Sequence, residues 1–407
     1  MYDWLERAAR RRPDTIALDA VGDRALTYAE LIGAAGKAAD GMRRAGLGPG
    51  TVTHLHGVGA RFAVSLHGAL QAGAAVVPID DRLSAEEQRL RTVCGELPYA
   101  DVATVMFTSG TTSAPKPVYL TLRNWEANAV GSALALGLDP GERWLCVMPL
   151  AHVGGLSILL RSTLYATTVI LHERFDTQAV LADLMDPARA VTLVSLVPTM
   201  LARLLDAGLE RPPRLRWTLL GGGPIPAPLL ERAAAAGVPV APTYGMTEGC
   251  SQIATFGFPL HGVELRLEQG EVVVRGPNFA PNTVGDDGWL HTGDLGELDE
   301  RGRLRIVGRA SDTIVSGGEN VAPAEVEAAL LEHPAVADAG VFSRPDEVWG
   351  ERVVASVVLR DGRSATAAEL QEFVAARLAR FKVPKEIVFS ERLPRTVSGK
   401  LLRRQLA

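Results

Sequence analysis

Strand-like and helix-like segments alternate through the first three quarters of the chain, and this order most restricts the possible folds. Apolar residues recur with helical spacing in the segment that starts at Leu26, and a short apolar run from Gly73 is typical of a buried strand. Residues 214–245 then follow the order strand, helix, strand. Because such segments pack as parallel sheets with helices on both faces, the sequence predicts an α/β fold.

The pattern changes twice towards the C-terminus. From about residue 262, apolar and polar residues alternate around a Gln-Gly turn, which predicts a β-rich subdomain over residues 262–308. After residue 312, amphipathic helices and strands form a predicted compact α+β unit. We therefore expect a large N-terminal domain over residues 1–308, a hinge over 309–312 and a small C-terminal domain over 313–407.

Length and composition exclude several classes of protein. The 407 residues exceed one ordinary domain, and 47% hydrophobic with 22% charged residues are values of a folded globular protein. The net charge of −5 argues against a nucleic-acid binder, and no apolar run reaches the roughly 20 residues that span a membrane. Widely spaced cysteines and an N-terminus without a signal-peptide pattern predict a cytoplasmic protein.

The first motif is a strand that runs into a loop of small hydroxyl residues, glycine and one lysine. Backbone N–H groups and hydroxyls in such a loop can donate to phosphate oxygens, and the lysine adds a charge. A solvated turn is the alternative. The residues of this predicted phosphate loop are Thr108, Ser109, Gly110, Thr111, Thr112 and Lys116.

The second motif, TYGMTEGCSQ over residues 243–252, follows a predicted strand. Ligands bind at this end of the strands in open α/β sheets. Tyr244 can stack on a flat base, and the Glu248 carboxylate can hold a hard cation such as Mg²⁺. The alternative is a strand-end turn with a surface glutamate.

Two further motifs lie closer to the C-terminus. Asp294 precedes a predicted hairpin, where it can accept two ribose hydroxyls, and Arg309 follows this hairpin. Gly317 and Gly318 permit a close backbone approach to a ligand. Lys400 follows Ser-Gly, just before a predicted terminal helix. The alternatives are a hairpin aspartate, a linker arginine and a lysine in a basic tail.

The order of these motifs resembles that of the adenylate-forming superfamily of acyl-CoA synthetases, firefly-type luciferases and peptide-synthetase adenylation domains. The matching strings are TSGTT-x-x-PK, YGMTE, TGD, GR…SGGEN…P-x-E-V-E and P-R-T-x-S-G-K, and the resemblance extends over nearly the whole chain. The resemblance implies two steps. A carboxylate attacks the α-phosphate of ATP, and a thiol, usually that of coenzyme A, then displaces AMP.

The resemblance also implies roles for the residues of the first step. Lys400 would neutralise charge between carboxylate and phosphate, and Glu248, next to Thr247, would hold Mg²⁺. The phosphate loop would hold the β- and γ-phosphates. The residues that would flank adenine are Gly221, Gly222, Gly223, Tyr244, Gly245 and Met246.

For the ribose and the second step, the resemblance implies a moving C-terminal domain. Asp294 and Arg309 would hold the ribose. Rotation about a hinge at Ser311 would withdraw the lysine and bring Gly317 and Gly318 to the thiol channel.

The chain departs from the family pattern in several places. Ser113 and Pro117 stand where the family usually has glycine, and both stiffen the phosphate loop. Ser311 replaces the common Asp or Lys at the hinge. Segments 79–102 and 252–263 are abbreviated, so we expect a trimmed peripheral subdomain.

Arg161 indicates the substrate, because it lies in the otherwise uncharged run GLSILLRSTLYATTVIL. A charge among apolar residues is unfavourable unless it is paired, so we expect it to bind a second carboxylate; a helix arginine that reaches solvent is the alternative. The stretches PLAHVGGLSILLRS, LLGGGPIPAPLL and YGMTEGCSQI resemble the o-succinylbenzoate–CoA ligases of menaquinone biosynthesis. His152 would close the acyl pocket, unless it is a core histidine bonded to backbone. The other predicted substrate residues are Ser157, Ser251 and Thr199.

Two other functions stay open at the level of sequence. An aryl- or medium-chain acyl-CoA ligase would not need Arg161. A non-catalytic module would bind ATP or an acyl-adenylate without turnover; the loop substitutions favour it, and Lys400, Asp294 and Glu248 argue against it. The expected partners are a small carboxylate, ATP with Mg²⁺ and coenzyme A, without nucleic acid or membrane, and a homodimer is compatible with such an enzyme.

Overall fold

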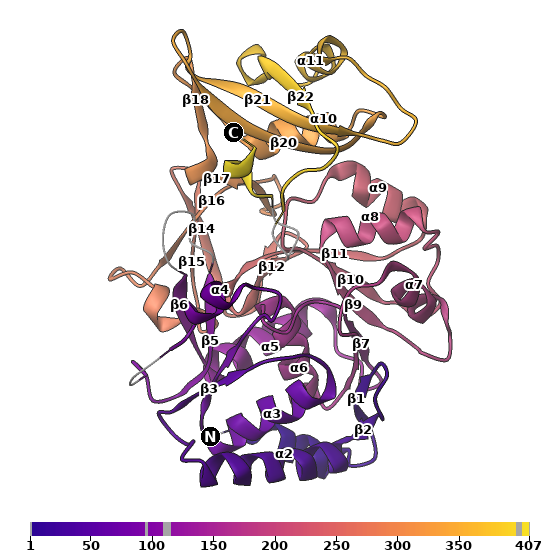
Figure 1. Cartoon of the computed structure of the whole chain (residues 1–407), viewed down its shortest axis with the longest axis vertical. Coiled ribbons are helices and arrows are strands. Elements are labelled where there is room, and N and C mark those ends of the chain that lie inside the picture. The colour runs from indigo at the N-terminus through magenta and orange to yellow at the C-terminus, as the bar shows by residue number, and fades with distance from the viewer. Residues whose placement is uncertain (1, 94–96, 109–114, 396–400, 407) are drawn as a thin grey trace. The chain divides into compact units, whose positions relative to one another are not determined.

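The computed structural model of the chain describes residues 2–93, 97–108, 115–395 and 401–406 (Figure 1). These residues form two compact units. The first comprises Met1–Gly222, Ala233–Glu264 and Val274–Leu290, and the second comprises Gly223–Arg232, Leu265–Val273 and His291–Ala407. The hinge predicted at residues 309–312 lies inside the second unit and stays a prediction.

The first unit contains a nine-stranded sheet, which includes the strands expected between residues 214 and 245. In sheet order, its strands are β13 (Phe258–Pro259), β12 (Ser251–Thr255), β11 (Val240–Met246), β10 (Trp217–Leu220), β9 (Leu193–Leu196), β7 (Arg143–Cys146), β8 (Thr168–Leu171), β1 (Ile16–Ala20) and β2 (Leu26–Thr27). The strands from β11 to β1 are parallel, and the pairs at both edges are antiparallel. The predicted α/β class is therefore confirmed.

A second, four-stranded sheet in this unit carries the start of the predicted phosphate loop. Its strands are β3 (Val52–Leu55), β4 (Ala75–Pro78), β5 (Val102–Thr108) and β6 (Lys116–Thr121). The first three run parallel, whereas β6 returns antiparallel to β5. Each residue of β4 is buried, as the apolar run at this position predicts.

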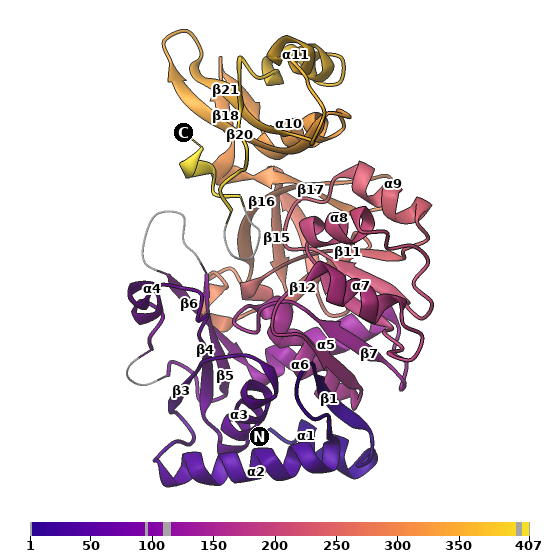
Figure 2. The same cartoon turned by 45° about the vertical axis from the view of Figure 1, so that its right-hand side comes forward.

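Helices pack on these sheets. They are α1 (Trp4–Arg11), α2 (Tyr28–Arg44), α3 (Gly59–Ala72), α4 (Ala85–Arg89), α5 (Leu122–Leu136), α6 (Val153–Tyr165), α7 (Thr177–Met185) and α8 (Pro198–Asp206), and α9 (Ala227–Ala235) includes residues of both units. Thr27 caps the N-terminus of helix α2. Its hydroxyl accepts the Glu30 amide, and the Glu30 carboxylate accepts the Thr27 amide. Figure 2 shows α3 above α2, and the two helices contact each other. Within the described ranges, no helix is long and apolar enough to cross a membrane.

The second unit contains the predicted hairpins and the α+β segment. Most residues of one four-stranded sheet belong to it: β14 (Glu264–Glu268), β15 (Glu271–Arg275), β16 (Leu290–Leu298) and β17 (Leu304–Arg309). Its other sheet has β19 (Glu319–Val321), β18 (Ile314–Ser316), β21 (Gly350–Leu359) and β20 (Val336–Asp346), with β22 (Glu386–Phe389) on β21. Helices α10 (Pro323–Leu331) and α11 (Ala367–Ala375) complete this segment. Val326, Leu330, Val353 and Leu370 belong to its buried core.

The predicted terminal helix is wrong. In the described residues 401–406, the 3₁₀ turn η5 (Arg403–Gln405) is the only helical element after Lys400. Leu401 pairs with Arg395 in an antiparallel bridge, and the Leu402 amide donates to the Pro394 carbonyl over 2.9 Å. Because these backbone groups pair with an extended segment, they are not available for helical hydrogen bonds.

His67 is a buried titratable group in the core of the first unit. It lies on α3 with 2% of its surface exposed, and its Nδ1 atom is 2.6 Å from the Tyr2 hydroxyl. Its Nε2 atom is 3.4 Å from the Thr163 hydroxyl. Burial lowers the pKa of His67 to about 4. The imidazole is therefore neutral in the folded protein throughout the physiological range.

The free energy of unfolding should rise with pH between the pKa of His67 in the folded chain, about 4, and its ordinary value of 6.5. The unfolded chain protonates His67 below about pH 6.5, whereas the folded chain does so only near pH 4. Lowering the pH from 7 to 4 should therefore reduce the free energy of unfolding by about 3 kcal/mol through this group. Urea unfolding at both pH values measures the effect. His67→Gln should remove it, and His261→Gln, at an exposed position, should not; equal pH dependence in all three proteins would contradict the prediction.

Candidate active site

The described ends of the predicted phosphate loop are paired with each other. Strand β5 ends at Thr108 and β6 begins at Lys116, and these two residues are partners in the antiparallel register. Thr108 is half-buried and Lys116 is exposed. The positions Ser109, Gly110, Thr111, Thr112 and Ser113 lie outside the described residues. The pairing brings Thr108 and Lys116, the first hydroxyl residue and the lysine of this motif, to the same end of the β5–β6 strand pair.

Asn282 is a residue near this loop that sequence reasoning missed. Its side-chain amide donates to the Pro117 carbonyl over 2.9 Å, and its carbonyl oxygen accepts the Tyr119 amide over 3.1 Å. Asn282 therefore bonds to the exposed edge of β6 as a neighbouring strand would. No local pattern identifies this contact, because the partners are more than 160 positions apart.

Close backbone packing explains two glycines of the predicted adenine site. A Cβ atom on Gly245 would lie 1.5 Å from the Ser251 carbonyl oxygen, and one on Gly221 would lie 2.8 Å from that of Thr243. Gly222 has a φ of +79°, which favours glycine. The other residues of this site differ in their location. Half-buried positions on β11 are Tyr244, Gly245 and Met246. Gly223 belongs to the second unit, and no atom would lie within 4 Å of a Cβ added to it.

Gly245→Ala should therefore disrupt the β11–β12 pair. The added methyl group overlaps a backbone atom that cannot rotate away, so we expect a loss of at least about 2 kcal/mol in the free energy of unfolding. Chemical denaturation measures this loss. Gly33→Ala, on an open face of α2, is the control and should be neutral or slightly stabilising. A Gly245→Ala protein as stable as the control would contradict the packing argument.

The turn after β11 contains the predicted magnesium residue. Thr247 and Glu248 lie in the 3₁₀ turn η1 (Thr247–Gly249), and the Glu248 carbonyl accepts the Ala280 amide over 2.8 Å. Among the described residues, no group of three or more acidic, histidine or cysteine side chains is arranged around a metal. Mg²⁺ is commonly held by one or two carboxylates together with substrate phosphates. The magnesium role of Glu248 therefore stays a prediction.

Arg161 lies on α6 and is almost completely buried, with 1% of its surface exposed. This excludes the alternative of an arginine that reaches solvent. Its Nη2 atom donates to the Asn128 side-chain oxygen, and its guanidinium carbon is 5.7 Å from the centre of the Trp144 ring. The Nε and Nη1 atoms have no hydrogen-bond partner among the described residues. Burial lowers the pKa of Arg161 to about 10, which still leaves a positive charge at neutral pH.

Asn128 connects this arginine to the turn after β11. Its side-chain nitrogen donates to the carbonyls of Gly249 (3.0 Å) and Gln252 (2.8 Å). Arg161 is thus held beside the predicted substrate segment 249–252 through one amide. Sequence reasoning missed Asn128, whose only local signal is a polar residue on the buried face of α5.

The other predicted substrate residues differ in exposure. Ser157 is fully buried and donates to the Gly154 carbonyl over 3.1 Å, whereas Thr199 is exposed on α8. Ser251 is half-buried with a φ of +99°, next to Cys250 at +56°. Two successive non-glycine residues in this region are strained, and such strain is concentrated at functional sites.

His152 precedes α6 and is not a core residue, because 42% of its side chain is exposed. Its Nε2 atom lies 3.7 Å from a carboxylate oxygen of Asp80. Arg82 binds both oxygens of Asp80, at 2.7 and 2.6 Å. Partial burial lowers the pKa of His152; Asp80 opposes the shift and Arg82 adds to it. His152 is therefore a neutral hydrogen-bonding group at pH 7.

In the second unit, the two predicted ribose residues contact each other. Arg309 Nε lies 2.7 Å from a carboxylate oxygen of Asp294, and the two residues are partners in the β16–β17 register. Asp294 is 6% exposed, and its amide donates to the Thr292 hydroxyl over 3.0 Å. The arrangement fixes the direction of this carboxylate.

The predicted thiol-channel glycines follow β18 in the same unit. Gly317 and Gly318 have φ angles of +62° and +85°, and the Gly317 amide donates to the Trp349 carbonyl over 2.8 Å. A Cβ atom on Gly317 would lie 2.7 Å from the Trp349 ring. Ser311 lies in the 3₁₀ turn η3 (Ala310–Asp312), and Lys400 lies outside the described residues.

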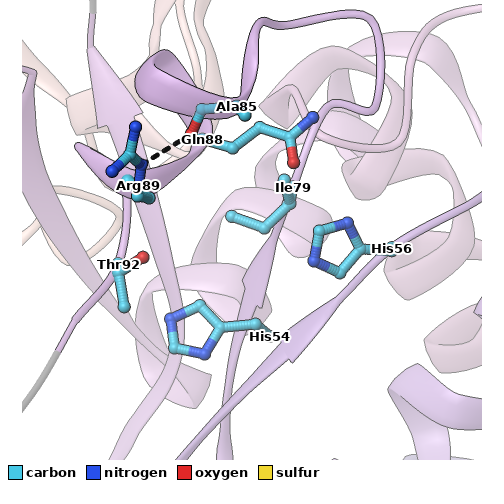
Figure 3. A pocket seen from close by; sticks show the side chains of 7 residues that line it. All are labelled: His54, His56, Ile79, Ala85, Gln88, Arg89 and Thr92. Carbon is cyan, nitrogen blue, oxygen red and sulfur yellow. Dashed lines mark hydrogen bonds between the residues drawn. The ribbon is translucent and has the colours of Figure 1, made fainter.

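A pocket of about 380 Å³ opens in the first unit between β3, α4 and the end of β4 (Figure 3). Its lining residues are His54, His56, Ile79, Ala85, Gln88, Arg89 and Thr92. In Figure 3 the two histidine rings lie near Ile79, and Arg89 bonds to the Ala85 carbonyl of its own helix. The pocket contains none of the predicted site residues that the structure describes. Five of its seven lining residues belong to the segment 79–102 that we expect to be abbreviated.

Comparison with known protein families gives matches over both parts of the chain. Residues 5–96 and 94–282 match the family described as AMP-binding enzyme, and residues 325–400 match the AMP-binding enzyme C-terminal domain. The first match is divided at residues 94–96, inside the segment predicted to be abbreviated.

Individual relatives match the chain over its full length. The 2-succinylbenzoate–CoA ligase of Bacillus cereus is 38% identical over 479 aligned positions, which cover 100% of this chain and 98% of the relative. The enzyme of the same name from Bacillus licheniformis is 37% identical, with 99% of each chain covered.

Solved structures agree with these relatives. The o-succinylbenzoate-CoA synthetase of Bacillus subtilis in complex with its acyl-adenylate intermediate has a TM-score of 0.90 and 37% identity, covering 100% of this chain and 98% of that one. The same enzyme with ATP and magnesium ion has a TM-score of 0.89 and 36% identity, with 99% of each chain covered. The chain therefore belongs to the AMP-binding enzyme family, and within it to the group that contains the 2-succinylbenzoate–CoA ligases.

Proposed function

We propose that the protein is an AMP-forming ligase that joins 2-succinylbenzoate to coenzyme A, as in menaquinone biosynthesis. In the first step, an oxygen of the succinyl carboxylate attacks the α-phosphorus of ATP and pyrophosphate leaves. In the second step, the thiol of coenzyme A attacks the acyl carbon of the adenylate and AMP leaves. Full-length similarity to ligases of this name supports the reaction.

The residues of the nucleotide site would act by position and charge. Thr108 and Lys116 stand at the two ends of the loop that would hold the β- and γ-phosphates. Asp294, in contact with Arg309, would accept the ribose hydroxyls. Glu248 would hold Mg²⁺, which neutralises phosphate charge when bound. Lys400 would stabilise the charge that develops during adenylation.

The observation that carries the substrate assignment is the buried, incompletely bonded guanidinium of Arg161. No ion pair of this side chain is found among the described residues, and two of its nitrogens have no acceptor there. A buried charge of this kind is unfavourable unless a partner neutralises it. The benzoate carboxylate would supply both the negative charge and the acceptors. We propose that the hydroxyls of Ser157 and Ser251 belong to the same subsite. The neutral imidazole of His152 would close the acyl pocket.

The decisive test of the function is pyrophosphate release with ATP and Mg²⁺. We expect strong release with 2-succinylbenzoate, weak release with benzoate or a medium-chain acid, and a CoA thioester only when coenzyme A is added. Pyrophosphate release with a monocarboxylate instead would support the ligase activity and reject the assignment of a dicarboxylate substrate. ATP binding without release for any acid would favour the non-catalytic module.

Arg161→Met should separate substrate binding from folding. We expect the KM for 2-succinylbenzoate to rise at least tenfold, because a charge-assisted contact contributes roughly 1.5–3 kcal/mol. The thermal midpoint should stay the same or rise, because a buried unpaired charge is replaced by an apolar side chain. Arg123→Ala, at an exposed position on α5, should change neither quantity. An unchanged KM for Arg161→Met would reject the role of this arginine.

We also propose a cytoplasmic location and a homodimer. The described cysteines, Cys146 and Cys250, are free and buried, which suits a reducing compartment. The homodimer follows only from the general preference of soluble enzymes for twofold assemblies, and light scattering would test it.

A further inference from the structure

The neighbours of Asn128 permit only one orientation of its side-chain amide. The Arg161 guanidinium has only donors, and the backbone carbonyls of Gly249 and Gln252 have only acceptors. The Asn128 oxygen therefore faces the arginine, and its nitrogen donates to the two carbonyls over 3.0 and 2.8 Å. Asn128 and Arg161 are each 1% exposed, so water does not compete for these bonds. The direction of the guanidinium in the first unit thus depends on this amide.

The charge of Arg161 is not neutralised by any anion among the described residues. The two acidic side chains that act on it most are Tyr165 and Cys250. Burial raises the pKa of Tyr165 to about 12 and the pKa of the Cys250 thiol well above its ordinary value, so both groups are neutral at pH 7. An uncharged amide at position 128 therefore leaves the positive charge of the arginine uncompensated.

A second amide shares the backbone part of this contact. The Asn278 side-chain nitrogen donates to the Gly249 carbonyl over 3.2 Å and to the Gln252 carbonyl over 3.5 Å. These carbonyls would keep a donor if position 128 lost its own. For Arg161, the structure shows no other acceptor in the part of the chain that it describes. The arginine is therefore the partner that depends most on Asn128.

We propose that Asn128 is a positioning residue that sets the selectivity for the ring carboxylate of the substrate. Its amide directs Arg161 without neutralising it, so the counter-ion has to come from a second carboxylate on the substrate. In Asn128→Asp the protein itself would supply the counter-ion, and the ring carboxylate would lose its partner. The proposal rests on the proposed function, because it assumes that Arg161 binds this carboxylate.

Pyrophosphate release with two acids tests this role. The acids are 2-succinylbenzoate and benzoylpropionate, the same molecule without its ring carboxylate, and the measured quantity is the ratio of their kcat/KM values. For Asn128→Asp we expect this ratio to fall at least about tenfold, because only one of the two acids loses a charge-assisted contact. A general disturbance of the site would lower both values and leave the ratio unchanged. Asn128→Leu keeps the charge of Arg161 without its direction, and should lie between wild type and Asn128→Asp.

Asn124→Asp is the matched control. Asn124 lies one turn earlier on α5, and its side-chain nitrogen also donates to two backbone carbonyls, those of Pro277 (2.8 Å) and Phe279 (2.9 Å). Its oxygen accepts the Thr121 amide, which a carboxylate can also do. The control loses the same kind of bonds without pairing with Arg161, so the ratio should not change. An unchanged ratio in Asn128→Asp, or an equal fall in both variants, would overturn the proposal.

Thermal unfolding tests the contact without catalysis. Asn128→Asp should lower the thermal midpoint by at least about 4 °C more in an Arg161→Met background than in wild type, because its buried carboxylate then has no cation. A double variant that does not fold while both single variants fold would support the contact equally. Equal losses in the two backgrounds would overturn it. If wild type releases no pyrophosphate with any acid, the proposed function fails, and this coupling alone then decides whether Asn128 holds Arg161.

Discussion

The side-chain amide of Asn128 joins three segments of the predicted substrate site: helix α5, helix α6 and the turn after β11. Its oxygen accepts Arg161 from α6, and its nitrogen donates to the carbonyls of Gly249 and Gln252. An amide suits this position because it has both an acceptor and donors, whereas a carboxylate would neutralise the guanidinium but offer no donor to the turn. The arginine is thus oriented without being neutralised. Its Nε and Nη1 atoms would remain available to the proposed ligand.

Much of the fold could be predicted because its signals are local. The helical spacing after Leu26 and the apolar run from Gly73 correspond to α2 and β4. The Gln-Gly turn joins β14 and β15, which are neighbours in one sheet. The motif residues were found in the same way, as short strings at the ends of strands. The predicted terminal helix failed because Leu401 and Leu402 pair with residues at positions 395 and 394.

The supporting contacts of the site could not be predicted. The partners of Asn128 lie 33 to 124 positions away in the sequence. His152 lies 3.7 Å from Asp80, which precedes it by 72 positions. The sequence identifies Arg403 only as part of a basic tail, because its acceptors Asp312 and Glu327 lie 91 and 76 positions away. Single-sequence patterns identify which residue types chemistry needs, but tertiary packing decides which side chains orient them. The roles of Arg161, Lys400 and the nucleotide residues stay predictions for the same reason.

The pairing of Thr108 with Lys116 affects how tightly the predicted phosphate loop could bind a nucleotide. A loop with free ends loses conformational entropy when a ligand brings those ends together, and this loss is subtracted from the affinity. Here the antiparallel pairing of β5 and β6 has already joined the ends during folding. The entropy lost on closing the loop therefore lowers the free energy of unfolding and does not lower the affinity for a nucleotide. Even a short phosphate motif can then retain most of its interaction energy with ATP.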